Sequence, residues 1–195
     1  MSNKNYYDFA ENDYLFVLSA YEAGGTWNSM CSLAQKVCER FLKHLIEQYY
    51  IPNNEIEVSE TESVMKAHNL NKIEKFIKDH TDINIDSDTH NALKNVNGYY
   101  YETSYPGDES YFVDKEDIDI AVKSMKICKE FTDQTILKRS ANKSLSETKP
   151  TGNGEGGDDG DADGTDSFGS SDGKSHSGSG DDTADSDDWT GLDEP

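Results

Sequence analysis

The sequence predicts an all-α protein: an antiparallel bundle of four to five helices followed by a disordered acidic tail. Apolar residues recur at helical spacing in several stretches between residues 7 and 131. Short turn segments connect these stretches, and none shows the regular alternation of a β-strand. The apolar content then falls sharply from about Asn142. We therefore divide the chain into a bundle over residues 1–140 and a tail over residues 141–195.

The first half of the bundle is predicted as two helices separated by a glycine pair. The first covers about residues 7–22 and ends at Ala23-Gly24-Gly25. Thr26 is a suitable N-cap for a second, longer helix that reaches about Tyr50. This second helix has the strongest periodic signal in the chain, formed by Met30, Ala34, Val37, Cys38, Phe41, Leu42, Leu45, Ile46 and Tyr49.

The second half is predicted as three further helices. A polar segment, residues 55–63, leads to a third helix with apolar residues from Val64 to Ile77. A fourth helix covers about residues 86–102, although Gly98 weakens it. After a turn at residues 105–108, Asp114 can cap a fifth helix, and the bundle closes near Lys138.

Charge and composition exclude several classes of function. The formal charge is -21, and residues 151–195 hold 14 acidic residues and one Lys. Non-specific nucleic-acid binding requires a basic surface, so it is not expected. No apolar stretch approaches the roughly 18 residues of a membrane span, and the polar start is unlike a secretory signal. The three cysteines lack CxxC spacing and are predicted to be buried thiols in a cytoplasmic protein.

The tail contains two partial motifs that predict neither a cofactor nor a metal site. Gly152, Gly154 and Gly157 have dinucleotide-loop spacing, but no strand precedes them and no helix follows. The acidic run from Asp159 matches the first half of a calcium loop. Its twelfth position is Ser170, where a bidentate Glu is required. The composition instead predicts disorder, because too little apolar surface is available to offset the loss of backbone entropy.

The bundle itself carries an ordered set of short motifs. Glu39 and Lys43 are four residues apart in the second predicted helix, and His68 stands in Ala67-His68-Asn69-Leu70. Three tyrosines at 99–101 precede Ser104-Tyr105-Pro106-Gly107-Asp108, and Lys115-Glu116-Asp117 opens the last helix. In this order and at these intervals, the set resembles the HEPN family, the higher eukaryotes and prokaryotes nucleotide-binding domain. The resemblance covers about residues 7–135.

The resemblance implies a homodimer with a nucleotide ligand or a nucleotidyltransferase-type partner protein, in a toxin–antitoxin or defence system. It assigns ligand binding to Lys43, His68 and Glu39. A Lys ammonium can contact a phosphate, and a His ring can donate or accept a hydrogen bond. Purely structural roles stay open, because an i,i+4 Glu–Lys pair stabilises any helix and the backbone can satisfy a His at a helix start.

The same resemblance predicts no catalytic residue. Ribonuclease members of the family have Arg followed by His after four to six residues. The corresponding positions hold residues 45–47 after Arg40 and residues 144–146 after Arg139, and none of these is His. Ser104 stands where the family often has Arg before Tyr-Pro. We therefore expect a domain that does not cleave RNA.

Two alternatives remain open from the sequence. The first is an endoribonuclease toxin with a displaced acid–base pair that uses His44 or His68. The second is an interaction protein that acts through its acidic tail, whose end places Trp189 and Leu192 among acidic residues.

Overall fold

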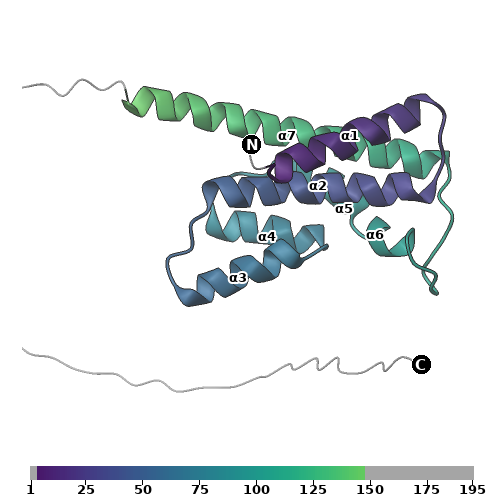
Figure 1. The fold of residues 1–195 in the computed structure, drawn as a ribbon, viewed down its shortest axis with the longest axis horizontal. Coiled ribbons are helices and arrows are strands. Elements are labelled where there is room, and N and C mark those ends of the chain that lie inside the picture. The colour runs from purple at the N-terminus through teal and green to yellow at the C-terminus, as the bar shows by residue number, and fades with distance from the viewer. Residues whose placement is uncertain (1–3, 148–195) are drawn as a thin grey trace, which may run out of the picture. The chain divides into compact units, whose positions relative to one another are not determined.

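The folded part of the chain consists of helices (Figure 1). The computed structural model describes the backbone of residues 4–147 and the side chains of residues 4–142. No strand occurs in these residues, so the all-α prediction is confirmed. The elements are α1 (Tyr6–Glu22), α2 (Asn28–Tyr49), α3 (Glu55–Lys66), α4 (Leu70–His80), α5 (Ser87–Val96), the single turn α6 (Tyr99–Glu102) and α7 (Lys115–Glu147). Of the predicted tail, residues 141–147 belong to α7, and residues 148–195 lie outside the described residues.

Helix α2 is the centre of the bundle. It packs against α1 and α7 and also contacts α4, α5 and α6 (Figure 1). The apolar stripe predicted for this helix is buried from Met30 to Ile46, and Tyr49 packs at its edge. The cysteines Cys31, Cys38 and Cys128 are buried and free, as the sequence predicted. Helix α2 is therefore the rigid element against which the polar side chains described below are placed.

Polar contacts and one glycine lie at the ends of α1 and α2. Asn5 caps α1 by accepting a hydrogen bond from the Asp8 amide at 3.1 Å, and the Asp8 carboxylate accepts one from the Asn5 amide at 3.0 Å. Gly24 follows α1 with φ +78°, a conformation that side chains disfavour. The predicted cap at Thr26 is wrong, because the N-cap is Trp27. Asn28, the first helical residue, instead binds the backbone of a distant loop, donating to Tyr111 O at 2.8 Å.

Helix α3 was not predicted, because residues 55–63 have no apolar stripe. Polar contacts at its first turn explain why it forms. Asn54 accepts a hydrogen bond from the Glu57 amide at 3.0 Å, and the Glu57 carboxylate accepts one from the Tyr50 hydroxyl at 2.8 Å. The helix ends at Lys66, so the predicted helix through Val64 and Ile77 is in fact α3 and α4, separated by residues 67–69.

The predicted fourth helix is also two elements. Gly98 has φ +125°, a conformation outside the helical range, so the helix is interrupted between α5 and α6. The predicted cap of the last helix is confirmed, because the Asp114 carboxylate accepts hydrogen bonds from the amides of Glu116 at 2.8 Å and Asp117 at 3.1 Å. Helix α7 continues to Glu147, past the predicted close of the bundle near Lys138.

Candidate functional site

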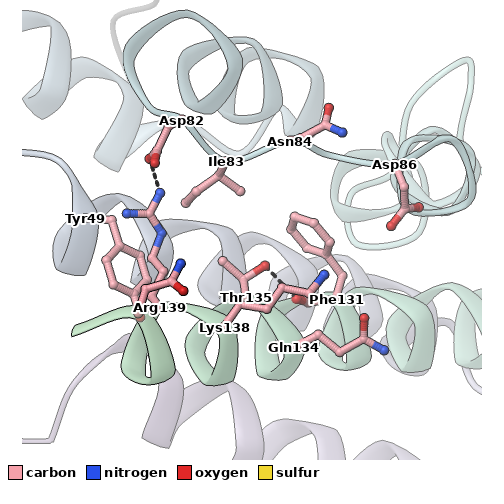
Figure 2. A pocket seen from close by; sticks show the side chains of 11 residues that line it. Tyr49, Asp82, Ile83, Asn84, Asp86, Phe131, Gln134, Thr135, Lys138 and Arg139 are labelled. Atoms are coloured by element: carbon pink, nitrogen blue, oxygen red, sulfur yellow. Dashed lines mark hydrogen bonds and ion pairs between the residues drawn. The ribbon is translucent and has the colours of Figure 1, made fainter. Parts of the chain in front are cut away.

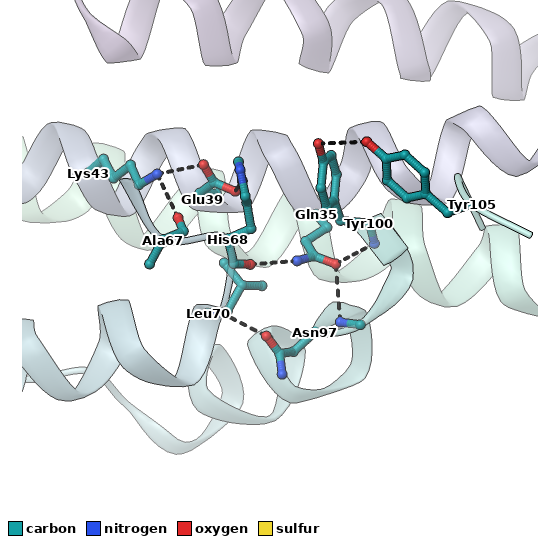
Figure 3. Close-up of polar contacts among 10 residues, drawn as sticks. Gln35, Glu39, Lys43, Ala67, His68, Leu70, Asn97, Tyr100 and Tyr105 are labelled. Carbon is teal, nitrogen blue, oxygen red and sulfur yellow. Dashed lines mark hydrogen bonds and ion pairs between the residues drawn. The ribbon is translucent and has the colours of Figure 1, made fainter. Parts of the chain in front are cut away.

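Helix α2 carries a polar row on its otherwise apolar face. Gln35, Glu39 and Lys43 are spaced four residues apart, so they lie above one another on one side of the helix. All three side chains are buried. Buried polar groups require partners, and each of the three contacts the segment that follows α3, while Gln35 also contacts the segment that follows α5 (Figure 3).

The predicted ligand-binding residues Glu39, Lys43 and His68 are in direct contact (Figure 3). The Lys43 ammonium lies 2.6 Å from Glu39 Oε1, and it donates a second hydrogen bond to the Ala67 carbonyl at 2.7 Å. His68 Nδ1 lies 3.0 Å from Glu39 Oε2. A carboxylate accepts hydrogen bonds, so this contact assigns a proton to Nδ1; when the ring carries only that proton, Nε2 is an acceptor. The carboxylate thus fixes the orientation and the tautomer of His68.

Gln35 holds the surrounding backbone in place. Its amide nitrogen donates to the His68 carbonyl at 2.7 Å, and its oxygen accepts from the amides of Gly98 at 3.1 Å and Tyr100 at 2.8 Å. Asn97 adds a hydrogen bond from the Leu70 amide at 2.8 Å. One side chain of α2 therefore connects the start of α4 to the start of α6, and this brings His68 next to Tyr100.

Four rings form an aromatic shelf beside the polar row, which we define as His68, Tyr100, Tyr101 and Tyr105. The His68 ring stacks on Tyr100 with centroids 4.6 Å apart and an interplanar angle of 21°. Tyr101 meets Tyr100 edge-on at 5.0 Å, and the Tyr100 and Tyr105 hydroxyls lie 3.4 Å apart. That hydrogen bond raises the pKa of the Tyr105 hydroxyl above its usual 10. Tyr101 and Tyr105 are 58% and 55% exposed, so solvent reaches their rings.

Lys36 supplies a cation at the shelf. Its ammonium lies 4.9 Å from the centre of the Tyr100 ring, within cation–π distance. Lys36 forms no ion pair with any residue between 4 and 142, whereas Lys43 is buried and paired. The accessible positive charge next to the rings is therefore on Lys36.

The structure thus brings together all three residues that the sequence singled out, but their ligand contacts stay a prediction. Sequence reasoning missed Gln35, Lys36 and the role of the tyrosines as one surface. Gln35 could have been noticed, because it occupies an apolar position of the α2 repeat. The position of Lys36 over Tyr100 depends on the backbone contacts of Gln35, which no local pattern reveals.

A second buried carboxylate repeats the arrangement on α4. Glu74 binds the Lys78 ammonium at 2.6 Å, and His90 Nδ1 lies 2.8 Å from the same carboxylate. Here too, Glu and Lys are four residues apart on one helix, and the His comes from the next segment. Lys78 and His90 are partly exposed, unlike Lys43. The Glu–Lys–His contact therefore also occurs in this fold without an aromatic shelf.

Arg40 and His44 lie one helical turn apart on α2 but occupy separate environments. Arg40 forms an ion pair with Asp13 of α1. His44 is buried, and its Nδ1 has no hydrogen-bond partner among the described residues. Burial lowers the pKa of His44, so the ring is neutral at pH 7. The two side chains are not joined into an acid–base pair.

The chain matches no protein-family model, no curated protein and no solved structure in the comparisons. Among the described residues, no helix is both long and apolar enough to cross a membrane.

Proposed function

We propose that this bundle is a HEPN-like, non-catalytic domain that binds a nucleotide on the aromatic shelf. The observation that supports the proposal best is the position of Lys36 over Tyr100, beside the exposed rings of Tyr101 and Tyr105. Exposed aromatic rings are stacking platforms for bases, and a Lys ammonium can contact a phosphate as a point charge. His68 adds an acceptor at Nε2, in reach of a hydrogen-bond donor on a stacked base.

In this proposal, Glu39 and Lys43 act through His68. Their charges cancel inside the protein, and the Glu39 carboxylate holds the His68 ring against Tyr100. They are positioning residues, and the ligand meets His68, Lys36 and the tyrosines. The homodimer, the nucleotidyltransferase-type partner and the toxin–antitoxin setting stay predictions from the resemblance.

Calorimetric titration of the full chain with ATP and GTP tests the proposal. Stacking on an aromatic ring contributes about 1–3 kcal/mol per base, so the double variant Tyr101→Ala/Tyr105→Ala should weaken binding roughly tenfold or more. Lys36→Ala should weaken ATP binding more than adenosine binding, since adenosine lacks phosphate.

Two matched controls accompany these variants. Phe112→Ala removes an exposed ring outside the shelf, and Lys94→Ala removes an exposed lysine from α5. Both should bind like the wild type. No heat with any nucleotide would contradict the proposal and favour the alternative in which the chain acts as an interaction protein.

A further inference from the structure

A pocket that includes no residue of the shelf lies at the C-terminal end of α2, where Tyr49 lines it (Figure 2). Its volume is about 690 Å³, within the range of small-molecule sites. Residues from the α4–α5 loop and from α7 line it, together with Tyr49 at the end of α2. Lys36 and Tyr49 are 13 positions apart along the helix, a distance of roughly 20 Å. The pocket is therefore a second candidate site, independent of the proposed function.

Arg139 lies at one end of this pocket in a fixed orientation. Its guanidinium lies 4.6 Å from the centre of the Tyr49 ring and forms an ion pair with Asp82 (Figure 2). The hydrogen bond from Arg139 lowers the pKa of Asp82, so the carboxylate is ionised at neutral pH. A planar guanidinium held against a ring presents its donors to a carboxylate with little loss of side-chain freedom.

Arg139 and Arg40 each form an ion pair with an aspartate, and the two aspartate side chains differ in solvent exposure. The Asp82 side chain is 82% exposed beside Arg139, whereas Asp13 is 22% exposed beside Arg40. Water can solvate Asp82 when it moves away, so another carboxylate can take its place on Arg139. Lys138, which is exposed and lines the same pocket, adds a second positive charge there.

Two apolar residues line the pocket among mainly polar ones. Ile83 of the loop and Phe131 of α7 face each other across it (Figure 2). Both belong to the core and keep only a small exposed area. A ligand that covers them would remove apolar surface from water. The Thr135 hydroxyl, which also lines the pocket, donates to the Phe131 carbonyl at 2.8 Å.

We propose that this pocket binds a free α-amino acid with an apolar side chain. The ligand carboxylate replaces Asp82 on the Arg139 guanidinium, and the released Asp82 carboxylate accepts hydrogen bonds from the ligand ammonium. The side chain of the ligand covers Ile83 and Phe131. One ion pair is thereby exchanged for two, and the net charge of the pocket does not change.

NMR titration of the ¹⁵N-labelled full chain with L-phenylalanine tests this proposal. We expect saturable shifts of the amides around Ile83, Asn84, Thr135 and Arg139, with a Kd in the millimolar range. Arg139→Gln should raise the Kd at least tenfold. Arg40→Gln is the matched control and should leave it unchanged, because Arg40 lies outside the pocket. No saturable shift in the wild type, or equal binding by Arg139→Gln, would overturn the proposal.

Analogues of the ligand test the exchange of partners. 3-Phenylpropionate lacks the ammonium and phenethylamine lacks the carboxylate, so both should bind the wild type more weakly than L-phenylalanine. In Asp82→Asn, phenylpropionate should bind at least as well as phenylalanine, because Arg139 is free and the ammonium has lost its partner. Unchanged phenylalanine binding by Asp82→Asn would contradict the role given to Asp82.

Discussion

The Lys43–Glu39 pair provides a sharp test of how the site is built. Both side chains are almost fully buried, at 3% and 8% exposed, and their charged atoms are 2.6 Å apart. Lys43→Met keeps the length and the apolar stem of the side chain but removes the ammonium. The variant leaves the Glu39 carboxylate buried with only His68 as its partner, and the Ala67 carbonyl loses its donor. Breaking a buried pair in this way costs about 3–5 kcal/mol.

Urea unfolding followed by circular dichroism measures this cost. The midpoint should fall while the slope stays constant, and Tm should drop on the order of 10 °C for a domain of this size. Lys66→Met is the matched control, because Lys66 pairs with Glu62 at the same i,i+4 spacing but is 78% exposed. An exposed pair of this kind contributes about 0.3–0.5 kcal/mol. Equal, small losses in the two variants would refute the assignment of Lys43 to the interior.

Three further predictions follow from the other titratable groups. Glu39→Gln should destabilise the fold by several kcal/mol more than Glu74→Gln. The reason is that Lys43 is left unpaired in the interior, whereas Lys78 can turn to water. The urea midpoints of the two variants measure the difference. Burial lowers the pKa of His44 below its usual 6.5, so the unfolded chain binds more protons just below pH 6.5. Stability should therefore fall as the pH drops below 6.5, and His44→Phe should show a smaller fall in pH-dependent melting curves. Total RNA should remain intact with the purified protein, because Arg40 is paired with Asp13 and His44 is buried. Cleavage that His44→Ala abolishes would contradict this prediction.

The sequence predicted the parts of the fold that depend on apolar periodicity. The stripe of α2 from Met30 to Ile46 is buried because a helix that repeats apolar residues on one side must cover that side. Helix α3 was not predicted, because its apolar residues Ile56 and Val58 are exposed and form no buried stripe. Contacts of Asn54 and Glu57 stabilise the start of this helix. Such contacts involve few residues and leave no periodic pattern.

From the sequence, only the part of the candidate site that lies on a single helix was predictable. The spacing of Glu39 and Lys43 on one helix indicates an i,i+4 pair, and the pair exists. That His68 joins the same carboxylate depends on where α3 ends and α4 begins, which the sequence did not reveal. The same is true of the tyrosines, because Gly98 redirects the chain so that Tyr100 faces α2. Packing between segments that are distant in sequence determines the position of His68 and the positions of the tyrosines.

The most direct test of nucleotide binding on the shelf is NMR mapping of the ATP contact surface. Titration of the ¹⁵N-labelled full chain with ATP should shift the amides of residues 98–105, His68 and Lys36 together, with a single Kd. The shifts should be lost in Tyr101→Ala/Tyr105→Ala and retained in Phe112→Ala. Shifts confined to another part of the bundle, or none at millimolar ATP, would contradict the account.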